Sequence, residues 1–316
     1  MPAASLKVVS CAPQSPPFGR VLTAMATPFD AEGRVDLDGA ARLAKALAAS
    51  GSEALVVTGS TGEAPTLEDS ERDELWRAVI ESISIPVLAG STSNDTAHSV
   101  VLTRRAEAAG AAGILAVTPY YNRPPQSGLK AHFSAIAGAT SLPVILYDIP
   151  IRTGRKIASS TILALAHEVA NIIGLKDAAG DAPATARLLA EAPAGFACYA
   201  GDDGMTLPLL SIGAVGLIGV ATHWAGQEFA EMIDAFLAGD LATAQQLQRA
   251  LLASIAFESS DDAPNPMPVK VMLGVMGLPG GPCRLPLGEG PADLAARAKA
   301  VLAELDVWRE QRGNRG

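Results

Sequence analysis

The sequence predicts a (β/α)8 barrel, an eightfold repeat of strand and helix, followed by a C-terminal helical region. Eight short apolar segments rich in β-branched residues recur along the chain, and successive segments begin 19 to 33 residues apart. That distance fits one strand, one turn and one helix and is too long for hairpins, so parallel strands are expected. The segments are continuous apolar runs, as in strands covered on both faces. An open doubly wound sheet is the competing fold. Two observations argue against it: no GxGxxG motif follows the first strand, and the chain contains eight regular units.

The expected strands begin near residues 21, 54, 87, 114, 144, 172, 196 and 215. Helical periodicity fills the stretches between them. Asp36 is placed to cap the first helix, and Thr66 with Asp69 resembles the capping box of the second.

After Thr222 only segments with helical periodicity follow, at about 226–238, 240–257, 266–277 and 291–308. A stretch rich in Pro and Gly, from 278 to 291, interrupts them. We therefore divide the chain into three parts, which are a flexible lead-in (1–18), the barrel (19–223) and a helical region (224–316).

The composition narrows the function. There are 24 Lys and Arg against 33 Asp and Glu, a net charge of −9 that disfavours nucleic acid and anionic membranes as partners. The longest apolar run, 209–221, is shorter than the roughly 20 residues of a membrane-spanning helix. The three cysteines have no CxxC spacing, which favours a reducing cytoplasm, and the four histidines lie at least 34 residues apart. We expect a cytoplasmic protein with no metal and no cofactor.

In such a barrel the carboxyl ends of the strands carry the chemistry. Lys176 ends the apolar run 172–175. Burial there lowers the pKa of an ammonium group, and only the neutral amine attacks a carbonyl, so Lys176 is a candidate Schiff-base residue. The competing interpretation pairs it with the neighbouring carboxylate of Asp177. Position alone does not decide between the two.

Further polar groups follow other strands. Thr61, Tyr121 and Tyr147 could pass protons along a chain of hydroxyls, although tyrosines also close barrels by packing. The loop 59–62 offers backbone N–H groups and two hydroxyls to a carboxylate or a phosphate, and it lacks the GK[ST] ending of a nucleotide-binding loop. Arg152 follows Tyr147 and either grips a substrate carboxylate or lies on the surface.

Five motifs follow five of the expected strands, in the order GSTGEAPTL, VTPYYNRPPQSG, LYDIPIRTG, IIGLKDAAGD and YAGDDG. Together they resemble the dihydrodipicolinate synthase and N-acetylneuraminate lyase family of class I aldolases, from about residue 21 to the end of the chain. The resemblance implies that pyruvate forms a Schiff base with Lys176 while Ser60 and Thr61 hold its carboxylate. It also implies that Tyr147 relays protons with Thr61 and with Tyr121 from a neighbouring subunit. The enamine then attacks an aldehyde.

Within the family, an arginine at the position of Arg152 is typical of the synthase branch. The resemblance therefore implies condensation of pyruvate with L-aspartate 4-semialdehyde to 4-hydroxy-tetrahydrodipicolinate, on the path to lysine and diaminopimelate. Gly201 and Ile218 are the further expected substrate-binding residues. A homotetramer built as a dimer of dimers is the expected assembly.

Two alternatives stay open. The loop reads GSTGE where synthases usually have GTTGE, and Ser60 is what the sialate lyases carry. A sister aldolase that acts on a sugar acid, N-acetylneuraminate or a 2-keto-3-deoxy acid, is therefore the first alternative. The second is a barrel that binds a keto acid without turnover.

Feedback by lysine is the last expectation that the resemblance provides. In inhibited members of the family, lysine binds at a dimer interface through a histidine and a glutamate. The matching positions here are Asp69, Arg72 and His98. Without the glutamate, the ammonium of lysine loses a charged partner worth about 1.5 to 3 kcal/mol. We therefore expect weak or absent inhibition by lysine.

Overall fold

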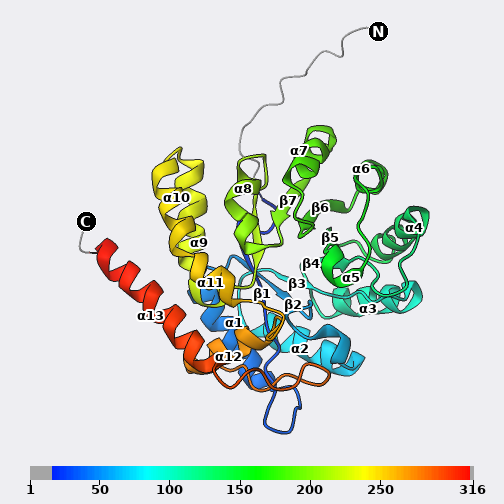
Figure 1. The fold of residues 1–316 in the computed structure, drawn as a ribbon. Coiled ribbons are helices and arrows are strands. Elements are labelled where there is room, and N and C mark those ends of the chain that lie inside the picture. Colours follow the sequence, from blue (N-terminus) through cyan, green and yellow to red (C-terminus); the bar gives the residue numbers. More distant parts are fainter. Residues whose placement is uncertain (1–15, 314–316) are drawn as a thin grey trace.

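Eight parallel strands form a closed barrel in the computed structural model, which describes residues 16–313 (Figure 1). The strands are β1 (Val21–Ala24), β2 (Ala54–Val57), β3 (Val87–Ala89), β4 (Gly113–Val117), β5 (Val144–Asp148), β6 (Ile172–Asp177), β7 (Ala197–Ala200) and β8 (Gly216–Gly219). Each strand pairs with its neighbours in the sequence, and β8 pairs with β1. The predicted barrel is confirmed, and each strand begins within one residue of its predicted start. Most of the predicted lead-in, residues 1–15, lies outside the described residues.

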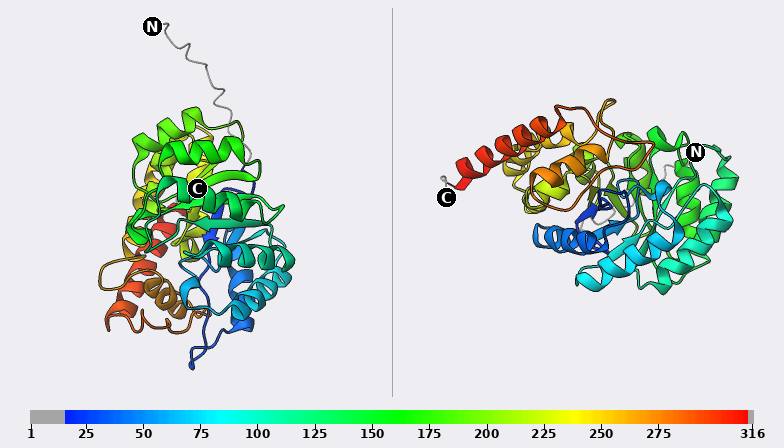
Figure 2. Two further views of the ribbon diagram at one scale, coloured as in Figure 1. Left: turned by 90° about the vertical axis from the view of Figure 1, so that its right-hand side faces the viewer. Right: turned by 90° about the horizontal axis from the view of Figure 1, so that it is seen from below.

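Helices surround the barrel on its outer side (Figure 2). They are α1 (Leu37–Ala49), α2 (Asp69–Ser82), α3 (Thr96–Ala108), α4 (Gln126–Ala137), α5 (Pro150–Thr153), α6 (Ser159–Glu168), α7 (Ala182–Glu191), α8 (Thr206–Leu210), α9 (Thr222–Leu237), α10 (Leu241–Ala250), α11 (Leu252–Phe257), α12 (Met267–Val275) and α13 (Leu294–Gly313). Two short 3₁₀ helices, η1 (Ala64–Thr66) and η2 (Asp203–Met205), precede α2 and α8. None of the helices in residues 16–313 is both long and apolar enough to cross a membrane.

The first two helices begin differently from each other. Asp36 caps α1 as predicted, because its side chain accepts the backbone N–H of Gly39 at 2.8 Å. The capping box predicted at Thr66 is wrong, since the box of α2 is formed by Glu68 and Glu71. Thr66 instead ends η1, and that extra turn delays the start of α2.

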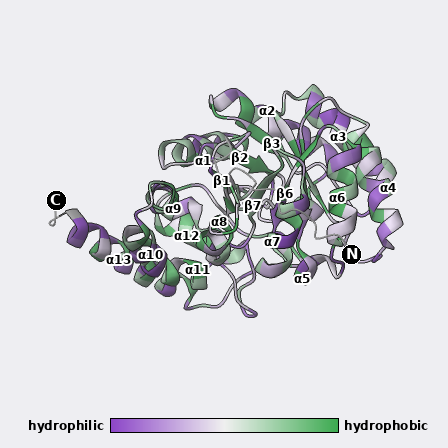
Figure 3. Ribbon diagram, turned by 90° about the horizontal axis from the view of Figure 1, so that it is seen from above, coloured by the Kyte–Doolittle hydropathy of each residue, from purple (hydrophilic) through white to green (hydrophobic). Residues whose placement is uncertain are grey.

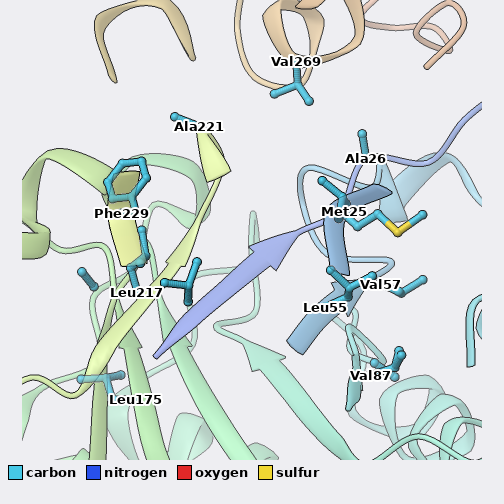
Figure 4. Close-up of a cluster of buried hydrophobic side chains, with 14 of the residues drawn as sticks. Met25, Ala26, Leu55, Val57, Val87, Leu175, Leu217, Ala221, Phe229 and Val269 are labelled. Carbon is cyan, nitrogen blue, oxygen red and sulfur yellow. The ribbon is translucent and has the colours of Figure 1, made fainter. Parts of the chain in front are cut away.

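Two layers of apolar side chains make up the core. The barrel interior is filled by one cluster that includes Leu22, Leu88 and Ile218. A larger cluster lies between the strands and the helices, and Figure 4 shows part of it, including Leu217 and Phe229. The hydropathy colouring agrees, because the strands are green while purple residues lie on the helices around them (Figure 3). With the interior packed, polar groups collect at the carboxyl ends of the strands.

After β8 the described residues contain no further strand, as predicted. Helix α9 packs against β1, and α12 and α13 pack against each other. In Figure 1, α13 extends away from the barrel towards the C-terminus. The division of the chain at residue 223 stays a prediction.

Candidate active site

Lys176 lies at the carboxyl end of β6 and is 3% exposed. It pairs in register with Tyr147 of β5, and its Nζ lies 4.4 Å from the centroid of the tyrosine ring. A Cβ at Gly201 would come within 2.9 Å of Lys176 Cγ, so the glycine leaves room for the lysine stem. Within the described residues Lys176 forms no ion pair.

The alternative interpretation, an ion pair with Asp177, is not formed. Neighbouring residues of a strand point to opposite sides of the sheet, and the Asp177 carboxylate faces the helices. It accepts hydrogen bonds from the hydroxyl of Thr185 and, at 2.9 Å, from the backbone N–H of Ala179. Lys176 therefore points into the barrel mouth, and no described carboxylate lies within ion-pair distance of its amine.

Burial lowers the pKa of Lys176 to about 8. The negative charges of Asp203 and Glu258 partly oppose this effect. A far larger fraction of this amine than of an exposed lysine is therefore neutral near physiological pH, and the neutral amine is the form needed for attack on a carbonyl.

Reductive trapping of Lys176 with pyruvate and cyanoborohydride is expected to become faster as the pH approaches about 8 and to level off above it. The folded-state pKa is lowered, so the reactive neutral amine appears at a lower pH than in an exposed lysine. Mass spectrometry of the trapped adduct over a pH series measures the midpoint. A midpoint near the ordinary value of 10.5 would contradict the buried, reactive amine.

Tyr147 and Ser60 lie together beside Lys176. Tyr147 is 5% exposed, and burial raises the pKa of its phenol while a hydrogen bond with the Ser60 side chain partly opposes that rise. The sequence had placed Thr61 in the relay with Tyr147. The structure brings the Ser60 hydroxyl to Tyr147 instead.

The Thr61 side chain contacts Asn265, which is not among the predicted site residues. Its Oγ1 accepts a hydrogen bond from Asn265 Nδ2 at 2.9 Å, and both residues are buried. Asn265 lies just before α12, far away in the sequence. The backbone oxygen of Asn265 also accepts from Arg152 at 3.0 Å.

A cavity of about 310 Å³ opens beside these groups. Ser60, Arg72, Tyr147, Arg152 and Asn265 are all part of its wall. The Arg152 side chain is exposed at the rim, so its guanidinium is accessible to a ligand. The cavity is thus bounded by hydroxyls and by a cation, a combination that suits a small carboxylate.

The remaining predicted residues are placed differently. Ile218 is fully buried in the interior cluster that also contains Tyr147. Tyr121 is 90% exposed, has a φ of 73° and does not reach Tyr147 of its own chain. The structure therefore brings together Lys176 and Tyr147 but leaves Tyr121 outside the site.

The loop that carries Ser60 and Thr61 is stabilised by a buried ion pair at its end. Glu63, which follows it, has a left-handed φ of 53°. Its Oε1 forms a fully buried ion pair with Lys270 at 2.5 Å, and its Oε2 accepts the backbone N–H of Arg284 at 2.9 Å. Sequence reasoning missed this support, because no local pattern links residues about 200 positions apart.

Two further carboxyls lie near Lys176. Asp203 accepts from the backbone N–H groups of Val220 and Ala221, the latter at 2.7 Å. Glu258 follows α11, which packs on η2, and burial together with the charge of Asp203 raises its pKa well above the usual range. In residues 16–313 no group of three or more His, Cys, Asp or Glu side chains is arranged to hold a metal ion.

A closed parallel barrel that presents a desolvated lysine beside a tyrosine has the construction of a lyase of the class I aldolase type. The profile of the Dihydrodipicolinate synthetase family matches residues 17–305. The chain belongs to this family, which confirms the resemblance.

Relatives in this family match along nearly their whole length. A 4-hydroxy-tetrahydrodipicolinate synthase of Moorella thermoacetica is 48% identical over 91% of this chain and 98% of that protein. The protein of the same name from Acidothermus cellulolyticus is 50% identical over 91% and 92% of the two chains.

Solved structures agree. The dihydrodipicolinate synthase of Bacillus anthracis superposes with a TM-score of 0.88 at 40% identity, covering 92% of this chain and 99% of that one. The enzyme from Cyanidioschyzon merolae, solved with lysine bound, gives a TM-score of 0.89 at 40% identity, over 92% and 98% of the chains. A monomeric dihydrodipicolinate synthase variant gives 0.87 at 33% identity, over 92% and 97%.

Proposed function

We propose that this protein is a 4-hydroxy-tetrahydrodipicolinate synthase, which joins pyruvate to L-aspartate 4-semialdehyde. The buried, unpaired amine of Lys176 carries the proposal, because it is the group that a Schiff-base condensation requires. The names and high coverage of the relatives support the choice of reaction. No metal or cofactor takes part in this chemistry.

The reaction balances with one molecule of water released. The neutral amine of Lys176 adds to the ketone carbon of pyruvate, and the carbinolamine loses water to give an imine. Removal of a proton from the methyl group gives an enamine, whose carbon attacks the aldehyde carbon of the second substrate. The amino group of that substrate then adds to the imine carbon, closes the ring and releases the lysine amine.

In this proposal each site residue has a separate role. Ser60 and Thr61 hold the pyruvate carboxylate. Tyr147 moves protons to and from the reacting atoms, and its closeness to Ser60 makes that hydroxyl the next member of the relay in place of Thr61. Arg152, at the cavity rim, binds the carboxylate of the semialdehyde. Gly201 gives space to the Schiff-base lysine, and Ile218 lies under the site as part of its apolar base.

Turnover with different aldehydes tests the proposal. Purified protein with pyruvate and L-aspartate 4-semialdehyde is expected to consume both, and N-acetylmannosamine or an aldehyde that leads to a 2-keto-3-deoxy acid is expected to react poorly. The reverse preference would establish the sister aldolase. Loss of the borohydride adduct with pyruvate would leave only a barrel that binds a keto acid without turnover.

We propose a cytoplasmic homotetramer, a dimer of dimers in which each chain lends Tyr121 to a neighbour. The exposed side chain and the left-handed backbone at Tyr121 support this, because among residues 16–313 the Tyr121 side chain forms no hydrogen bond that would offset the cost of that conformation. One structural neighbour is a monomeric variant. Gel filtration that shows a fully active monomer would refute the proposal that Tyr121 completes the site of a neighbouring chain.

Lysine is expected to leave the rate unchanged at concentrations that saturate a sensitive enzyme. Arg72 is 5% exposed, its guanidinium donates to the backbone oxygen of Ala64, and it is part of the cavity wall, so a positive charge is already present there. His98 is engaged with Asp69 at 2.9 Å. An effector ammonium would meet a like charge and find no free glutamate. Half-inhibition by micromolar lysine in the coupled assay would contradict this.

A further inference from the structure

Asn265 connects the C-terminal region with both sides of the cavity. The residue is 7% exposed and belongs to the cavity wall. Its side chain donates to Thr61, the proposed pyruvate ligand, and its main chain accepts from Arg152, the proposed aldehyde ligand. Its two contacts therefore act on two different substrates and can be separated by substitution, because a change of side chain leaves the backbone oxygen in place.

The direction of the side-chain hydrogen bond fixes the direction of the Thr61 hydroxyl. A hydroxyl has one hydrogen to donate and two lone pairs that accept. The amide N–H of Asn265 uses a lone pair of Thr61 Oγ1, at 2.9 Å. Among the described residues Thr61 Oγ1 has no second partner, so its hydrogen is free to be donated to a ligand bound next to Ser60 and Asn265, which both line the cavity.

We propose that Asn265 is a positioning residue that keeps the Thr61 hydroxyl turned outward as a donor for the pyruvate carboxylate. The inference rests on the proposed function, in which Thr61 contacts that carboxylate. The carbonyl oxygen of the Asn265 side chain supports this role. Asn265 Oδ1 is buried and accepts no hydrogen bond from residues 16–313, so the side chain is only half satisfied by the fold. A residue retained for stability alone would not leave a buried carbonyl without a donor.

Asn265→Leu, which keeps the branched outline of the side chain and removes the donor, is expected to raise the KM for pyruvate about tenfold, roughly the value of one hydrogen bond to a charged partner. The KM for L-aspartate 4-semialdehyde is expected to stay within about twofold, because Arg152 still meets the backbone oxygen of residue 265. Asn265→Asp is expected to be no better than Leu, since a carboxylate accepts the Thr61 hydrogen and draws it away from the substrate. Restoration of the wild-type KM by Asp would overturn the proposal.

A second pair of variants separates positioning from structure. In the Thr61→Val background the hydroxyl is gone, so adding Asn265→Leu is expected to produce no further rise in the KM for pyruvate. A full additional tenfold rise would show that Asn265 acts independently of Thr61 and would overturn the inference.

Asn171→Leu provides the matched control. Asn171 is an amide whose Nδ2 donates to three backbone oxygens at the opposite end of β6, including that of Ala137 at 2.9 Å. Its loss is expected to lower the melting temperature and to leave the KM for pyruvate unchanged. Wild-type protein that cannot be trapped with pyruvate and borohydride would refute the proposed function, whereas a trapped wild type with an unchanged KM in Asn265→Leu would refute only the role of Asn265.

Discussion

Lys176→Met is expected to reduce kcat by at least about 10³-fold and to abolish the covalent adduct with pyruvate. Methionine preserves the length and apolar stem of the side chain, so the barrel mouth stays filled. It lacks the amine that forms the imine, and without that covalent step the methyl protons of pyruvate are no longer activated. Steady-state turnover and mass spectrometry after borohydride reduction measure the two effects.

Lys130→Met is the control for this variant. Lys130 lies on α4, where its Nζ pairs with Glu168 at 2.6 Å on the exposed surface, so its loss removes one charge and leaves the site untouched. The control is expected to retain full activity and a full adduct. Undiminished turnover in Lys176→Met itself would end the Schiff-base interpretation.

Lys270→Met is expected to lower the free energy of unfolding by about 3 to 5 kcal/mol, the usual effect of removing one partner from a buried ion pair. Lys270 and Glu63 are both about 98% buried or more, and their oxygen and nitrogen are 2.5 Å apart. The substitution strands the carboxylate of Glu63 in the interior, next to the left-handed turn after Thr61. Denaturant unfolding monitored by circular dichroism measures the loss.

The double variant Lys270→Met with Glu63→Gln is expected to recover most of that stability. The neutral amide still accepts the backbone N–H of Arg284, and no unpaired charge is left behind. Lys45→Met, at an exposed position of α1, is expected to change stability by less than about 0.5 kcal/mol. A double variant as unstable as the single one would show that the lysine contributes through contacts other than this ion pair, such as the ammonium over the ring of Phe29.

The strands and Lys176 were predictable because their signals are local. An apolar run of four to six residues predicts a strand, and polar residues at its carboxyl end lie close to the barrel mouth. The choice between Asp177 and a free amine was not predictable, because it depends on Thr185 occupying that carboxylate from α7. The exchange of Ser60 for Thr61 in the relay likewise follows from a turn geometry that the residue types alone do not specify.

The support of the site could not be predicted for a different reason. Asn265 and Thr61 lie 204 positions apart, and the local sequence around either residue does not predict their contact. Such pairs arise only once the closed barrel brings the C-terminal helices back over the loop after β2. Tyr121 is 90% exposed in the single chain, so its role in the relay depends on the proposed neighbouring subunit.

The late position of Asn265, Lys270 and Arg284 in the chain has a consequence for synthesis on the ribosome. All eight strands are complete by residue 219, so the barrel can close while the last third of the protein is still being translated. At that stage the loop with Ser60 and Thr61 lacks its contacts with Asn265, Lys270 and Arg284. In a nascent or prematurely terminated chain we therefore expect a closed barrel whose pyruvate site is incomplete. The loop that holds the pyruvate carboxylate in the proposed mechanism is therefore expected to reach its final arrangement only after residues 265–284 have been translated.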